Sequence, residues 1–388
     1  MSGRCCPQIA QPTARGGGPA NTRSMSPPAT VALASPEDVV GVIPAMLGFH
    51  PRESLVVLGL RGDRRRSSLT MRTNLPPPGV PPTGLVELVV ERLRGCDVDG
   101  ALAVVYTSRG SADLPHATLA ERLGEGLRRA GIECLDVLLV ADRRIRSYLC
   151  RSEACCSLEG IPIPQLPTAA AQRFHAEVVE LGGRIWDSRE QLEASVAAPT
   201  GTRAEALERA FRRASDALTD DLVAAGPDGV RAGTAELLHA VHGRYVEGAE
   251  RISDEEAARL CLGLADVAAR DDLLVWGGGE RPDALLSLLG DLAASSLPPS
   301  DVPVCVALAW TAYQAGNGVL AGCAVDRALA TDPTSTLGQL LRRAIEVALP
   351  PERLLTVADA VPTFPGRTTD ERISEEPRGG VSRSGGAA

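Results

Sequence analysis

The chain has 388 residues, of which 44% are hydrophobic and only 3% aromatic, so its cores consist chiefly of aliphatic side chains. At roughly 150 residues per domain, this length predicts two domains. The net charge of −9 argues against binding along a nucleic-acid backbone or at a membrane surface, because both need clustered positive charge. We therefore expect no nucleic acid and no membrane among its partners.

All 40 basic residues are arginine, because the sequence contains no lysine. A P-loop needs a lysine at the nucleotide phosphates, and a pyridoxal-phosphate enzyme needs a lysine for its Schiff base. Protein kinases also need a strand lysine that holds the phosphates. The composition therefore disfavours P-loop nucleotide binding and pyridoxal phosphate, and the identity of any cofactor stays unknown.

Both ends of the chain are polar and rich in glycine, which predicts disorder over residues 1–30 and 357–388. The first of these segments has no apolar run of signal-peptide length. Without an export signal we expect a cytoplasmic protein whose ten cysteines do not form a disulfide framework.

Strands and helices alternate in the front part of the chain, over residues 31–167. The expected elements are a helix over 36–46, strands over 55–60 and 67–73, a helix over 85–94, a strand over 101–107, a helix over 119–130, and strands over 134–140 and 145–150. Ser35 is the expected N-cap of the first helix, with Pro36 in its first position. The strand–helix–strand unit predicts a parallel crossover, and the last strand is expected to be antiparallel. The predicted fold class of this domain is α/β, or α+β, with a mixed sheet.

The apolar rhythm becomes helical after residue 167, which predicts an all-helical, repeat-like domain over residues 168–356. Two capping boxes are expected, at Thr202 with Glu205 and at Ser253 with Glu256. The expected helices lie over 169–181, 230–247, 283–295, 304–315, 318–331 and 336–348.

The uncharged segment from Val302 to Val325 is long enough for a membrane span, which needs about 20 residues. A Gly316-Asn317-Gly318 turn interrupts it, and unpaired turn backbone is costly in lipid. We therefore predict a buried helical hairpin. Its small residues and the following Asp332-Pro333 resemble one degenerate tetratricopeptide repeat, although an ordinary alanine-rich hairpin explains them equally well.

A ligand site is predicted in the loop after the first crossover strand, because ligands of open α/β sheets bind beyond the carboxyl ends of strands. Its polar residues are Thr107, Ser108, Arg109, Ser111 and Asp113.

The sharpest cysteine cluster is Cys150, Cys155 and Cys156. Three thiolates suit zinc, but their spacing is poor and no fourth ligand lies nearby. The neighbouring arginines would lower a thiol pKa, which suits redox chemistry. Inert structural thiols are the third alternative, and the sequence leaves all three open.

Two weaker patterns involve histidine. Glu236, His239 and His242 share one helical face, where a metal site or, more simply, a polar surface is expected. His50 lies in a turn, where it would be a general base only with a partner that the sequence does not supply.

Three separate segments resemble a family from high-GC bacteria, the domain of unknown function 4192. The first runs from Gly48 to Val57. The second is Ser147 to Cys150 with Cys155, Cys156, Gly160 and Pro162, and the third runs from Ala309 to Pro333. The resemblance spans roughly residues 33–350, and the chain departs from the family pattern at Ile145 and Ser157. It implies a bacterial cytoplasmic protein without an assigned activity.

The sequence thus predicts first a non-catalytic binding or scaffold protein whose helical half contacts a protein partner. The alternatives are a metal-binding or thiol-redox protein centred on Cys150, Cys155 and Cys156, and an enzyme acting on a small molecule in the loop after Thr107.

Overall fold

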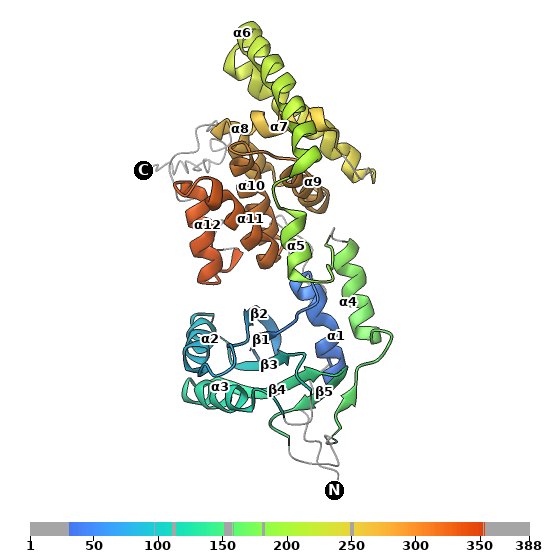
Figure 1. The fold of residues 1–388 in the computed structure, drawn as a ribbon, viewed down its shortest axis with the longest axis vertical. Coiled ribbons are helices and arrows are strands. Elements are labelled where there is room, and N and C mark those ends of the chain that lie inside the picture. The colour runs from blue at the N-terminus through green and yellow to red at the C-terminus, as the bar shows by residue number, and fades with distance from the viewer. Residues whose placement is uncertain are drawn as a thin grey trace, which may run out of the picture.

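The computed structural model describes residues 31–353 except for 97, 111–113, 151–156, 158, 181–182, 249–251 and 352. The segments predicted to be disordered, 1–30 and 357–388, lie outside the described residues. The described chain begins with a mixed sheet and its helices and continues as a helical part, as predicted (Figure 1).

The sheet has six strands in the order β2-β1-β3-β4-β5-β6. Only β3 and β4 run parallel, and helix α3 (Ala117–Arg129) connects them. The predicted crossover is therefore confirmed. The strands are β1 (Ser54–Arg61), β2 (Arg66–Asn74), β3 (Gly100–Tyr106), β4 (Glu133–Ala141), β5 (Arg144–Ser147) and β6 (Ile161–Pro162).

The strand β5 ends three residues earlier than expected. The Ser147 hydroxyl accepts hydrogen bonds from the backbone N–H groups of Leu149 and Cys150, at 3.1 and 2.9 Å. This side-chain turn competes with the sheet ladder, so pairing stops at Ser147.

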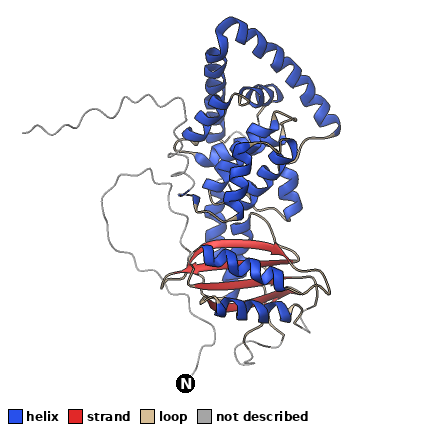
Figure 2. Ribbon diagram, turned by 90° about the vertical axis from the view of Figure 1, so that its left-hand side faces the viewer, coloured by secondary structure: helices blue, strands red, loops and turns tan. Residues whose placement is uncertain are grey.

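The two faces of the sheet bury separate apolar layers. Leu55 and Val57 of β1 face α2 (Thr83–Gly95) and α3, whereas Val56 and Leu58 lie in the cluster that includes α1 (Pro36–Leu47). This alternation follows from the two-residue period of a strand. Figure 2 shows the sheet with helices packed over it. Helix α1 begins as predicted, because the Ser35 hydroxyl accepts from the Asp38 N–H at 3.2 Å.

The helical part contains nine described helices. They are α4 (Ala169–Glu180), α5 (Arg189–Ser195), α6 (Gly201–Val246), α7 (Asp254–Gly263), α8 (Val267–Trp276), α9 (Pro282–Ala294), α10 (Asp301–Gln314), α11 (Gly318–Thr331) and α12 (Thr336–Glu346).

Helix α6 differs most from the prediction. The expected capping box at Thr202 and Glu205 is wrong, because the helix already begins at Gly201 and Thr202 lies inside it. The helix expected from residue 230 is only the second arm of α6. The arms meet at Gly226, whose φ of 71° and ψ of −178° are open almost solely to glycine, and Pro227 follows. The corner where the two arms meet projects from the rest of the molecule (Figure 2). The capping box of Ser253 and Glu256, in contrast, is confirmed at the start of α7.

The uncharged segment forms the predicted hairpin. Gly316, with a φ of 78°, interrupts the helical backbone between α10 and α11. The Asn317 side chain caps α11 by accepting from the Leu320 N–H at 3.1 Å. Within the described part of the chain, no helix has both the length and the apolar character of a bilayer span.

A buried arginine ties four helices of this part together. The Arg327 side chain of α11 is 10% exposed, and its Nε donates to Asp301 Oδ2 at 3.2 Å. Its Nη1 donates to the carbonyls of Val196 and Ala293, and its Nη2 to the carbonyl and hydroxyl of Ser296. All five N–H groups of the guanidinium thus have acceptors.

The two parts of the chain are joined at the β2 edge of the sheet, which faces the helices (Figure 1). The backbones of Gly48 and His50 each bond to Trp186, at 2.8 and 3.0 Å, and Phe49 between them is buried. Cys96 Sγ lies 4.0 Å from the Ala348 carbonyl on the far side. One apolar cluster continues from α1 and the sheet into the helical part.

Candidate ligand-binding site

Polar residues gather at the carboxyl ends of the parallel strands β3 and β4. The Thr107 N–H donates to the Val140 carbonyl at 3.1 Å, so the parallel ladder extends one residue past the end of β3. The following residues, Ser108 and Arg109, are exposed at the rim of the sheet. This is the position that ligands of open α/β sheets occupy.

Glu53 lies beside this loop because β1 is antiparallel to β3, with Ser54 opposite Tyr106. Its carboxylate accepts from the Ser108 N–H at 2.5 Å and from the Thr107 hydroxyl at 3.1 Å. Burial raises the pKa of the Glu53 carboxyl, but these hydrogen bonds outweigh it and hold that pKa below its usual value. Glu53 adopts a left-handed backbone with a φ of 42°.

His116 and Arg109 complete the site. His116 caps α3 with a left-handed φ of 64°, and its buried Nε2 has no hydrogen-bond partner within the described chain. Burial and the Arg109 guanidinium lower the pKa of His116, while Glu53 acts against them. The Arg109 side chain is exposed, and its guanidinium has no hydrogen bond or ion pair to any residue of the described chain.

The structure brings together three of the five residues that the sequence predicts for this site: Thr107, Ser108 and Arg109. Ser111 and Asp113 lie outside the described residues. Sequence reasoning missed Glu53 and His116. Glu53 directly precedes a buried strand, but only the antiparallel register of that strand with β3 shows that it reaches the loop.

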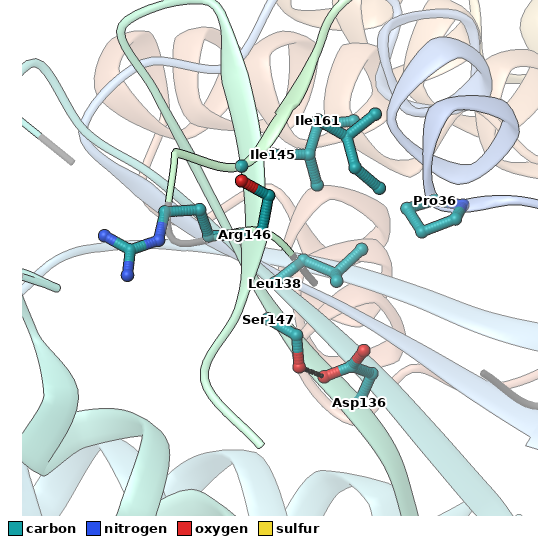
Figure 3. Close-up of a pocket in the computed structure, with 9 residues that line it drawn as sticks. Pro36, Asp136, Leu138, Ile145, Arg146, Ser147 and Ile161 are labelled. Atoms are coloured by element: carbon teal, nitrogen blue, oxygen red, sulfur yellow. Dashed lines mark hydrogen bonds between the residues drawn. The ribbon is translucent and has the colours of Figure 1, made fainter. Parts of the chain in front are cut away.

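A small recess lies elsewhere, between the start of α1 and the strands β4 and β5. Figure 3 shows that Pro36, Leu138, Ile145 and Ile161 face one another, whereas Arg146 points away. At its edge the Ser147 hydroxyl donates to Asp136 Oδ1 at 2.6 Å.

The carboxyl at this recess is already satisfied by the protein. Burial raises the pKa of Asp136, although the bonds from Ser147 and the Val137 N–H oppose the shift. The walls are apolar, and we assign the recess no ligand.

The cysteine cluster is described only at Cys150, whose backbone N–H donates to the Ser147 hydroxyl. Cys155 and Cys156 lie outside the described residues.

The two histidines of α6 pack against an aromatic ring. His239 and His242 meet Trp276 edge to face, with ring centroids 4.4 and 4.8 Å apart. His242 Nε2 is 3.1 Å from the Arg281 carbonyl. His242 is buried, so the expectation of a polar surface is wrong for this residue. Among the residues described, no group of three or more His, Cys, Asp or Glu side chains is arranged to hold a metal ion.

His50 contributes its backbone to the junction with Trp186. Its side chain is exposed near Asp187 and His175, away from the strand-end site.

Fold and site together define a class of protein: a mixed α/β sheet with a polar strand-end site, joined through one edge to a helical array. The family described as Domain of unknown function (DUF4192) matches residues 36–352, and the chain belongs to it. No curated protein and no solved structure matches this chain.

Proposed function

We propose that this protein is a non-catalytic binding protein that holds a small anionic molecule at the strand-end site formed by Glu53, Thr107, Ser108, Arg109 and His116. The observation that supports this most directly is the Arg109 guanidinium, which is exposed and unpaired within the described chain. A guanidinium binds carboxylates and phosphates with two parallel hydrogen bonds.

The surroundings of Arg109 suit an anion with further hydrogen-bond acceptors. The Ser108 N–H and the Thr107 hydroxyl both point at a carboxylate, that of Glu53. A ligand anion at the Arg109 guanidinium would gain charge-assisted bonds at a rim where water is only partly excluded, while Glu53 occupies the two neighbouring donors.

The test is ligand-dependent stabilisation of the full chain. Nucleotides, sugar phosphates and small carboxylic acids are added at constant ionic strength, and the melting temperature is measured with calorimetric titration of any hit. We expect at least one class to bind and Arg109→Ala to weaken it about tenfold or more. Arg128→Ala is the matched control, because Arg128 is also exposed but lies at the opposite end of α3. A flat response across the panel, or equal losses in both variants, contradicts the proposal.

The proposal includes a protein partner for the helical part. Helix α12, which continues the pair α10–α11, exposes the apolar side chains of Leu340 and Val347, at 57% and 54%. Such side chains contribute to interfaces when a partner covers them. Affinity capture with the wild type and with Leu340→Asp tests this, and an unchanged set of captured proteins contradicts it.

We also propose that the protein acts in the cytoplasm. The support is that, among the described residues, Cys96, Cys134, Cys261, Cys305 and Cys323 are free thiols. Disulfides are rare in reducing compartments. Fractionation of cells that express the tagged protein is the direct test.

A further inference from the structure

We propose that the Glu53 carboxylate occupies the place of a ligand's carboxylate, so that the site binds a small carboxylic acid when Glu53 swings out to solvent. This inference rests on the proposed function and names the chemical class of its ligand. Three observations support it. They concern the donors of Ser108 and Thr107, the attachment of Glu53 to β1, and the Arg109 guanidinium, which has no partner among the described residues.

The donors are aimed at a carboxylate. The Thr107 hydroxyl accepts from the Arg109 N–H at 3.2 Å, so its own proton is directed toward Glu53. The Ser108 N–H meets the oxygen Oε1 of the same group at 2.5 Å. Thr107 is only 8% exposed and is held by the strand ladder, so these donors keep their positions when the acceptor leaves.

Glu53 itself is held less firmly than the donors. The residue is exposed, so its side chain reaches solvent without opening the core. Its release therefore sacrifices hydrogen bonds that an incoming carboxylate replaces.

Arg109 gives an external carboxylate an advantage over Glu53. Glu53 accepts from Ser108 and Thr107, whereas the Arg109 guanidinium makes no bond to it. Because a free molecule is not tethered to β1, we expect it to settle where it accepts from the guanidinium as well as from the two donors. A ligand of this kind gains one charge-assisted contact that the internal carboxylate lacks.

The experiment is chemical rescue of the full-length Glu53→Ala variant. Acetate is titrated against the wild type and the variant at constant ionic strength, with chloride and inorganic phosphate as the comparison anions. We expect acetate to raise the melting temperature of Glu53→Ala and to bind it about tenfold or more tightly than the wild type, because the internal competitor is gone. Adding Thr107→Val or Arg109→Ala to the variant should abolish the rescue.

Two controls keep the outcome unambiguous. Glu125→Ala also removes an exposed carboxylate, which forms an ion pair with Arg129 on α3. Acetate should not raise the melting temperature of this variant. Glu53→Gln preserves the side-chain volume in case Glu53→Ala fails to fold, and it should also bind acetate more tightly than the wild type does.

Equal effects of phosphate and acetate would overturn the assignment to carboxylates. If Glu53→Ala ignores acetate while the wild type binds another anion through Arg109, this inference fails and the proposed function stands. If neither protein binds any anion of the panel, both fail.

Discussion

Three charged residues show how burial determines the role of a side chain. Arg327 and Asp301 are almost fully enclosed, and their bonds join α5, α9, α10 and α11. The guanidinium is satisfied at every N–H, whereas Asp301 Oδ1 is buried and has no hydrogen-bond partner among the described residues. Glu53, in contrast, makes its bonds at the surface, where water competes for the same groups. We expect Arg327 and Asp301 to determine stability and Glu53 to determine binding.

Replacing Arg327 with Met should lower the free energy of unfolding by about 3–5 kcal/mol, because the Asp301 carboxylate is then left buried without its counterion. Urea denaturation measures the loss. Arg343→Met, at an exposed position of α12, should change it little. The double variant Asp301→Asn with Arg327→Met should regain part of the loss, and strictly additive losses would show that the two side chains do not interact.

Replacing Glu53 with Gln should produce a stability difference that depends on pH. The pKa of the folded Glu53 carboxyl lies below its ordinary value of 4.5, so its contribution is present above that pH and disappears as the pH falls through the folded pKa. At neutral pH we expect a loss of about 0.5–1 kcal/mol, because the group is exposed. Urea denaturation should show that the difference in the free energy of unfolding between the wild type and Glu53→Gln is smaller near pH 3 than at neutral pH. A difference that stays constant would contradict a lowered pKa for Glu53.

At the scale of elements, turns and corners place the helices. Helix α1 ends at Gly48 in a left-handed conformation, and the chain then bonds to Trp186 before it enters β1. The corner of α6 at Gly226 likewise needs a conformation that favours glycine. In both places the glycine determines the direction of the following element. The residues next to it follow no helical or strand period from which that direction could be predicted.

Gly48→Ala should therefore destabilise the protein by about 1–2 kcal/mol, the cost of a left-handed alanine. Its added Cβ would lie at ordinary contact distance, 3.5 Å, from the Arg184 carbonyl, so the backbone rather than a clash causes the loss. Gly84→Ala, in open space on α2, should be neutral or stabilising. Thermal unfolding compares the two, and equal effects would contradict the backbone argument.

At the scale of the whole molecule, the sheet and the helices share one apolar cluster through α1 and α5. Helix α4, beyond the predicted boundary at residue 167, packs against α1 of the front part. Elements from both sides of the boundary thus depend on each other for burial.

We expect this continuity to produce a single unfolding transition. Ile43→Ala on α1 and Leu289→Ala on α9 both truncate fully buried side chains of this cluster, and each should cost about 2–5 kcal/mol. Calorimetry should show both variants shifting the same transition. Two separate transitions, each sensitive to one variant only, would contradict the shared core.

The sequence by itself determined the local architecture. The apolar blocks of β1, β3 and β4, the Ser35 and Ser253 caps and the glycine turn between α10 and α11 all follow from residue type and spacing, because these preferences act over a few residues. The strand-end rule also located Thr107, Ser108 and Arg109.

Only the tertiary structure decided what these elements bring together. Glu53 reaches a loop that lies 55 residues further along the chain, Arg327 finds acceptors on three other helices, and Trp186 bonds to the turn after α1. Such contacts depend on strand register and on how helices dock, and neither leaves a periodic trace in the sequence. The packed chain is therefore what turns a polar loop into a site with a carboxylate, a histidine and an arginine that has no partner among the described residues.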